Sequence, residues 1–321
     1  MKISGFMLGL LALLMAGSAA AQTHYPEKPI HLVVGFPPGS PPDTFARLFG
    51  QRLTGTWSEP VLIENVTGAA GNIAADRVAK AAPDGYTLGV LTEAQIVVNP
   101  GLYALAYDPV RDFAPVSQLF ASPNLLVVSN AVPAKSLEEL VALAKAQPGA
   151  LTFVSGGSGS TAHMAGELFK SAAGIDIRHV PYKGVLAAMP DLLGGRVTMV
   201  FSPMAIVLPM VREGKLRALA VTSLKRSAAA PELPTIAESG YPGFEVAGWN
   251  GLLAPAKTPA AVVRALNVEA VKALAHPEIR AKLDGLGLQA IGSSPDQFAA
   301  VIASQIPKWT KVIRDAGIKA D

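Results

Sequence analysis

Short runs rich in branched apolar residues alternate with helical patterns along most of the chain, and this alternation limits the possible folds most strongly. The runs expected to form buried strands are 30–35, 61–64, 87–91, 125–128, 151–154, 177–180, 198–201 and 216–221. Strands separated by helices are typical of an α/β fold with largely parallel sheets. We therefore expect mixed, mainly parallel sheets flanked by helices.

Two segments, 117–123 and 243–255, are expected to carry the chain from one group of strand–helix units to another. Two crossings imply a discontinuous first domain, made of residues 22–123 and 247–321, and a second domain made of residues 124–246. Three helices are expected after the second crossing, at 258–275, 277–285 and 295–316, with Pro307 kinking or interrupting the last.

The first residues resemble an export signal. Lys2 precedes an apolar run over 6–15, and small residues lead to Ala21. This order is typical of a secretory signal peptide, with cleavage after Ala21. The alternative is a membrane anchor, but the run is well short of the roughly 20 residues that a bilayer requires. We expect residues 1–21 to be removed and the mature chain to reach the periplasm.

Composition excludes several functional classes. The 321 residues contain no cysteine, so disulfides and thiolate chemistry are excluded. A net charge of +3 with no basic cluster argues against nucleic-acid binding. The five histidines show no metal-ligand spacing, and the turn at 156–160 ends in Ser160 where a nucleophile elbow has glycine. We expect no metal, no cofactor and no enzymatic activity.

Three glycine-rich turns lead from a strand into a helix, at 36–43, 68–72 and 155–161. In open parallel sheets such turns lie at the carboxyl ends of the strands, where ligands bind. Glycine allows a close approach of the backbone, and a helix start offers unpaired N–H groups and a positive dipole end. The pattern favours an anion site, although ordinary tight turns would look the same.

Several short motifs run in order through nearly the whole chain. They are YPEKPI at 25–30, FPPG at 36–39, PDGYTL at 83–88, NP at 99–100, HVPYKG at 179–184, DLLGG at 191–195, GKLRALAVT at 214–222 and KW at 308–309. Together they resemble the Bug, or TctC-like, solute receptors of tripartite tricarboxylate transporters. The resemblance implies a two-domain, class II-like periplasmic binding fold that closes over a carboxylate. The residues expected around the ligand are Phe36, Gly39, Ser40, Asp43, Gly157, Ser158, Ser160, Thr161 and His163, with Asp191 bordering the cleft. From the glycine turns and the loop after 87–91, we add Gly71 and Glu93.

Two of these residues have alternative interpretations. Asp43 falls in the first helical turn and would cap the helix together with Ser40. Glu93 would either line the cleft, repelling a second carboxylate and accepting a hydroxyl or amine, or be a solvated loop residue. The family usually has glycine where this chain has Ser40, and Pro41-Pro42 is a further departure.

The expected function is therefore capture of a small carboxylate, without turnover, for the membrane subunits of a tripartite tricarboxylate transporter. We expect a monomer. The alternative is a sensory receptor of the same fold that signals its ligand state to a membrane kinase.

Overall fold

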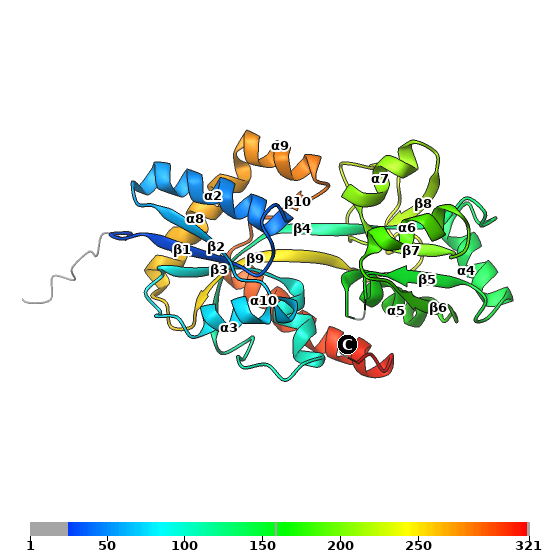
Figure 1. Cartoon of the computed structure of the whole chain (residues 1–321), viewed down its shortest axis with the longest axis horizontal. Helices are drawn as coiled ribbons and strands as arrows, with labels where there is room; N and C mark the ends of the chain where they lie inside the picture. The colour runs from blue at the N-terminus through cyan, green and yellow to red at the C-terminus, as the bar shows by residue number, and fades with distance from the viewer. Residues whose placement is uncertain (1–24, 158, 320–321) are drawn as a thin grey trace, which may run out of the picture.

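Two mixed sheets share one long strand (Figure 1). The computed structural model describes residues 25–157 and 159–319, so the expected signal peptide at 1–21 lies outside the described residues. Sheet A has the strand order β2–β1–β3–β9–β4–β10, and sheet B joins β8, β4, β7, β5 and β6. The strands are β1 Ile30–Val34, β2 Val61–Asn65, β3 Thr87–Thr92, β4 Phe113–Ser129, β5 Thr152–Ser155, β6 Arg178–Pro181, β7 Met199–Pro203, β8 Leu216–Val221, β9 Ala247–Pro255 and β10 Gln289–Ala290.

Helices cover both faces of each sheet, as expected for an α/β fold (Figure 1). They are α2 Pro41–Trp57, α3 Asn72–Ala79, α4 Leu137–Ala146, α5 Thr161–Ala173, α6 Val185–Leu193, α7 Met204–Arg212, α8 Ala260–Ala275, α9 Pro277–Gly285 and α10 Pro295–Asp315, with short turns η1 Ala69–Gly71, η2 Ala94–Val98 and η3 Asn99–Gly101. Figure 1 shows two lobes, one around sheet A and one around sheet B, which we call lobe A and lobe B. Within the described residues, no helix is both long and apolar enough to cross a membrane.

The two lobes are joined by β4 and β9, which run side by side between them (Figure 1). These strands pair antiparallel from Phe113 opposite Pro255 to Pro123 opposite Ala247. Beyond this ladder β4 continues into sheet B, where it pairs with β7 and β8. The segments expected to cross between units are thus parts of extended strands. Of the predicted domain boundaries, 123/124 falls inside β4 and 246/247 at the start of β9, and the division into domains stays a prediction.

Parallel pairing places the glycine turns at one end of each sheet. In sheet A, β1 lies parallel to β2 and β3, and in sheet B, β5 lies parallel to β6 and β7. The turns after β1, β2 and β5 therefore lie at carboxyl strand ends, as the sequence predicts. A β-carbon on Gly159, in the turn after β5, would meet the Leu102 side chain at 2.6 Å. The turn from sheet B thus packs against a loop of lobe A.

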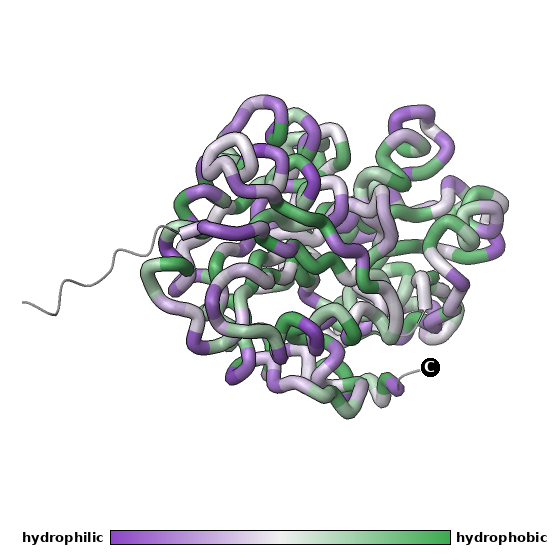
Figure 2. The backbone as a smooth tube through the Cα atoms, turned by 60° about the vertical axis from the view of Figure 1, so that its left-hand side comes forward, coloured by the Kyte–Doolittle hydropathy of each residue, from purple (hydrophilic) through white to green (hydrophobic). Residues whose placement is uncertain are grey.

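One apolar core cluster extends through both lobes. It includes Phe153 and Phe169 beside sheet B together with Trp249 and Phe298 beside sheet A, all at most 1% exposed. Figure 2 shows hydrophobic residues along the central strands and hydrophilic residues gathered on outer turns and helix faces. Gly251 on β9 allows this packing, because a β-carbon there would overlap the Phe298 ring of α10.

The three helices expected after the second crossing are present, and one begins late. Helix α10 begins at Pro295 as expected, where Ser294 forms a capping box with Gln297. Helix α8 begins at Ala260, two residues after its expected start at 258, and Thr258 Oγ1 donates to the Pro255 carbonyl instead of capping the helix. The expected interruption at Pro307 is not found, since α10 continues through it to Asp315.

Candidate functional site

The two lobes meet at Gly248 on the crossing strand β9. Thr161 Oγ1, at the start of α5 in lobe B, lies 3.5 Å from the position of a β-carbon on Gly248. Glu93 Oε2, from the end of β3 in lobe A, lies 3.7 Å from the same position. Because Gly248 has no side chain, Thr161 Oγ1 and Glu93 Oε2, which come from different lobes, can both approach the same point. We call this place the junction.

The first glycine turn, after β1, is held together by Asp43. The Asp43 carboxylate is only 1% exposed and accepts hydrogen bonds from Gly39 N–H at 2.8 Å, Arg47 Nε at 3.0 Å and Asn65 Nδ2 at 2.8 Å. Burial alone would raise the pKa of this carboxyl, but the bonds from Arg47, Gly39 and Asn65 lower it below the ordinary value. Asp43 therefore fixes the turn, as the structural interpretation has it, but the expected capping by Ser40 is not found, because the Ser40 side chain makes no hydrogen bond to the start of α2.

Few backbone donors remain in the first turn. Pro41 and Pro42 have no N–H, Gly39 N–H is bound by Asp43, and Ser40 N–H donates to the Pro37 carbonyl at 3.2 Å. The Ser40 hydroxyl also donates to Pro37, at 2.7 Å. The start of α2 is therefore a poor anion site, although Gly39 is exposed and Phe36 and Ser40 are half-buried.

The second turn has an unusual backbone. Four consecutive residues, 68–71, have positive φ, and two of them, Ala69 and Ala70, are not glycine. Left-handed conformations of this kind in residues with a β-carbon cost about 1–3 kcal/mol and concentrate at functional sites. Gly71 N–H closes the turn on the Gly68 carbonyl at 2.8 Å, which leaves the Ala69 and Ala70 N–H groups at its open, exposed end.

Sequence reasoning missed Gln95, which supports this turn from inside. Gln95 is fully buried, its Nε2 donates to the Gly71 carbonyl at 2.7 Å, and its Oε1 accepts from Thr92 N–H at 2.7 Å. A β-carbon on Gly35 or Gly71 would overlap the Gln95 amide. Gly71 is therefore needed to fit Gln95, and it is buried rather than open to a ligand.

The third turn, after β5, is organised by His163. This side chain is 6% exposed, its Nδ1 accepts from Gly159 N–H at 3.2 Å, and its ring stacks on His179 at 3.8 Å between centroids. Ser160 caps α5 by accepting from His163 N–H at 3.3 Å. Gly157 adopts a φ of 116° and is half-buried. Ser158 lies outside the described residues.

The start of α5 is the best-placed anion donor. Among the described residues no acceptor is found for the N–H groups of Thr161 and Ala162, as expected because a helix leaves its first N–H groups unpaired. Unlike α2, this helix has no proline in its first turn, and no acidic residue there opposes an anion. The helix dipole adds about 0.3–2 kcal/mol for an anion at this end.

Glu93 is buried at the junction, so it is not a solvated loop residue. It is 4% exposed, and its Oε1 accepts from Trp309 Nε1 of α10 at 2.9 Å. Burial raises the pKa of Glu93 to about 7, partly opposed by the Trp309 hydrogen bond and the charge of Lys308, while Glu245 raises it further. Oε2 has no hydrogen bond within the described part of the chain and is the oxygen nearer Gly248.

Asp191 is engaged within lobe B. Its carboxylate accepts from Tyr182 Oη at 2.5 Å and from Arg196 Nε at 2.7 Å, and these two bonds lower its pKa below the ordinary value. The contacts tie α6 to the segment after β6. Among the described residues, Asp191 forms no hydrogen bond or ion pair with a group of lobe A.

Two buried amide atoms on the crossing strands lack partners within the described residues, and no sequence pattern pointed to them. They are Asn124 Nδ2 on β4 and Asn250 Oδ1 on β9. Asn250 lies two residues from Gly248 and therefore on the same face of β9. An unsatisfied buried polar atom in a native structure requires an explanation, such as a bound water or ligand.

The raised pKa of Glu93 predicts a pH-dependent stability. The carboxyl of the unfolded chain ionises near its ordinary pKa of 4.5 and that of the folded chain near 7, so the folded state holds the extra proton between these values. The stabilisation from Glu93 is thus complete below about pH 4.5 and is lost as pH rises to about 7, by up to about 3 kcal/mol. Urea denaturation at pH 5 and pH 8 should show Glu93→Gln gaining stability relative to wild type at the higher pH.

The matched control is Glu232→Gln, which removes an exposed carboxylate. Its unfolding free energy should follow wild type at both pH values. If the unfolding free energy of Glu93→Gln changes between pH 5 and pH 8 by as much as that of wild type, the Glu93 carboxyl does not titrate in this range.

Comparisons with known proteins agree with this architecture. Residues 45–318 match the model of the TctC family, described as the tripartite tricarboxylate transporter family receptor. Protein BugT of Bordetella pertussis is 37% identical over 308 residues, covering 95% of this chain and 94% of BugT. A solved R. palustris protein with adipate is 37% identical over 92% of this chain and 99% of that one, with a TM-score of 0.75. MatC from Rhodopseudomonas palustris with bound malate is 34% identical over 90% of this chain and 100% of MatC, with a TM-score of 0.71.

The family match covers most of the chain, and the relatives align along nearly their whole lengths. The solved relatives have the α/β periplasmic binding protein fold that the motifs imply. The chain therefore belongs to the TctC, or Bug, family of tripartite tricarboxylate transporter receptors, which are solute-binding proteins and not enzymes.

Proposed function

We propose that this protein is a periplasmic receptor that captures a small carboxylate carrying a hydroxyl or amino group and presents it to the membrane subunits of a tripartite tricarboxylate transporter. Family membership supports the receptor role. Two solved relatives are described with adipate and with malate, both of which are dicarboxylates. The ligand would lie between two domains, residues 22–123 with 247–321 and residues 124–246, that close over it.

One observation carries the proposal: the start of α5 meets Glu93 across Gly248 at the junction. The free N–H groups at Thr161 and Ala162 would receive the ligand carboxylate, helped by the exposed Ala69 and Ala70 N–H groups of the second turn. Each hydrogen bond to a charged group contributes roughly 1.5–3 kcal/mol. Three or four such donors are enough for micromolar binding, about −8 kcal/mol, after the ordering cost.

The second ligand group would face acceptors. Glu93 Oε2 and Asn250 Oδ1 both lack a hydrogen-bond donor in the described chain. Asn250 Oδ1 is buried, and Glu93 as a whole residue is 4% exposed. A hydroxyl or ammonium group satisfies such atoms, whereas a second carboxylate is repelled by an ionised Glu93. Contacts from Phe36, Gly39, Gly157, Ser158 and Ser160 would complete the site, while Asp43, Gly71, His163 and Asp191 position its walls.

Carboxylate binding is tested by titration calorimetry with L-malate and its neutral diamide. At pH 6, where Glu93 is mainly neutral, we expect micromolar binding of L-malate and none of the diamide, because only the acid carries the charge that the α5 start favours. Thr161→Val should weaken L-malate about tenfold through the lost hydroxyl contact. The matched control, Thr310→Val, changes an exposed threonine of α10 and should bind as wild type does. Binding of both compounds with equal affinity would contradict an anion site.

The role of Glu93 predicts a pH-dependent affinity for a dicarboxylate. Because the pKa of Glu93 is raised to about 7, the side chain is mainly neutral at pH 6 and mainly ionised at pH 8. L-Malate should therefore bind several-fold more tightly at pH 6, and Glu93→Gln should remove this difference. An unchanged pH dependence in the variant would mean that Glu93 does not face the ligand.

The transport role is tested by uptake of the radiolabelled ligand in a strain lacking the gene. Uptake should be lost, return with the wild-type gene and fail to return fully with Thr161→Val. If uptake persists while a transcriptional response to the ligand disappears, the protein is a sensory receptor instead.

A further inference from the structure

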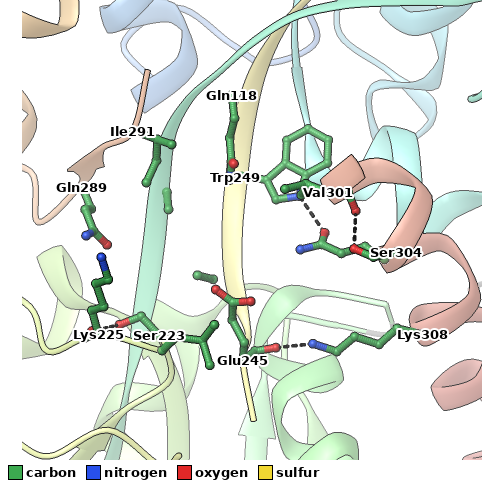
Figure 3. A pocket seen from close by; sticks show the side chains of 14 residues that line it. Gln118, Ser223, Lys225, Glu245, Trp249, Gln289, Ile291, Val301, Ser304 and Lys308 are labelled. Atoms are coloured by element: carbon green, nitrogen blue, oxygen red, sulfur yellow. Dashed lines mark hydrogen bonds between the residues drawn. The ribbon is translucent and has the colours of Figure 1, made fainter. Parts of the chain in front are cut away.

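A second pocket lies on the opposite face of β9 from the junction, since Ala247 and Trp249 line it and Gly248 does not. It has a volume of about 420 Å³, and its walls come from both lobes. Figure 3 shows Gln289 and Ile291 on one side, Ser223 and Lys225 below, and α10 on the other side, with β4 and β9 between them. None of the residues proposed above for carboxylate capture lines this pocket.

The pocket is large enough for a small organic ligand and has suitable walls. Small-molecule sites in proteins occupy about 300–1,000 Å³ and combine apolar surface with a few polar groups. Leu224, Trp249, Ile291 and Val301 supply the apolar part. Trp249 is fixed in place by a hydrogen bond from its Nε1 to Gln305 Oε1 at 2.7 Å, and by edge contact with Phe298 at 5.0 Å between ring centroids.

Three charged side chains line the pocket, and they differ in their contacts. Lys308 is engaged, because its Nζ donates to the Glu245 carbonyl at 2.6 Å and lies 4.8 Å from the Trp309 ring centroid. Burial lowers the pKa of Lys308. The Glu245 carboxylate and the Lys225 ammonium form no ion pair or side-chain hydrogen bond within the described part of the chain.

We propose that this pocket binds a zwitterion with an apolar side chain, such as an apolar amino acid. The ligand's ammonium would pair with Glu245, its carboxylate with Lys225, and its side chain would pack on Trp249 and Ile291. Figure 3 shows the Glu245 carboxylate directed into the pocket, with Lys225 on one side of it and Lys308 on the other. A simple anion would face the Glu245 charge and a simple cation would leave Lys225 unpaired, so a ligand with both charges fits best.

The test uses three compounds of similar shape: L-phenylalanine, 3-phenylpropanoate and 2-phenylethylamine. Calorimetry on the full mature protein should show L-phenylalanine binding at least about tenfold more tightly than either singly charged analogue, since each loses one charge-assisted contact. Glu245→Gln and Lys225→Met should each weaken L-phenylalanine about tenfold or more. Thermal melts of both variants check that they are folded.

Thr161→Val separates this pocket from the carboxylate site. L-Phenylalanine affinity should be unchanged in Thr161→Val, and L-malate affinity should be unchanged in Lys225→Met, which is the control because Glu245 acts on the pKa of Glu93. The proposal is overturned if the three compounds bind alike, if none binds, or if Thr161→Val weakens L-phenylalanine while the two pocket variants do not. Failure of L-malate to bind would contradict the carboxylate site alone.

Discussion

The antiparallel ladder between β4 and β9 is the contact on which the remaining structure depends. It ties the two sheets together, because β9 also pairs with β3 in sheet A and β4 continues into sheet B to pair with β7 and β8. The ladder also places Gly248 where the two lobes meet and Trp249 against α10. Successive residues of β9 point to opposite faces of the sheet, so Gly248 faces the junction and Trp249 faces the second pocket.

The polar groups around the junction divide into those that build the turns and those that remain open. Asp43, Gln95 and His163 use their hydrogen-bonding capacity within the protein and hold three turns in shape. The start of α5 and Glu93 Oε2 remain open, one as donor and one as acceptor. A site of this kind binds through backbone that is already positioned, so little ordering is required when the ligand arrives.

Sequence reasoning identified the strands well because buried parallel strands appear as short apolar runs. The sequence predicts that segment 117–123 is a connection, because the polar residues Ser117, Gln118 and Ser122 interrupt the apolar pattern of a strand. In the structure this segment is the middle of β4, which passes between the lobes. The lack of free N–H donors at the start of α2 follows from Pro41 and Pro42 alone, because proline has no backbone N–H. In contrast, the burial of Glu93 depends on Trp309, which is 216 residues away in sequence, and no local pattern predicts such a contact. The same is true of Gln95 against Gly71.

The strand order of sheet A limits the order in which its strands can pair while the chain is synthesised from its N-terminus. β9 lies between β3 and β4, yet it follows the whole of sheet B in sequence. Until residues 247–255 arrive, β3 and β4 each keep an unpaired edge, and such edges readily pair with other chains. The residues of sheet B that follow β4 can fold earlier, because β5 to β8 are contiguous in sequence. The edges of β3 and β4 therefore close only after most of the chain has been made, and until then they are the part of sheet A most exposed to pairing with other chains.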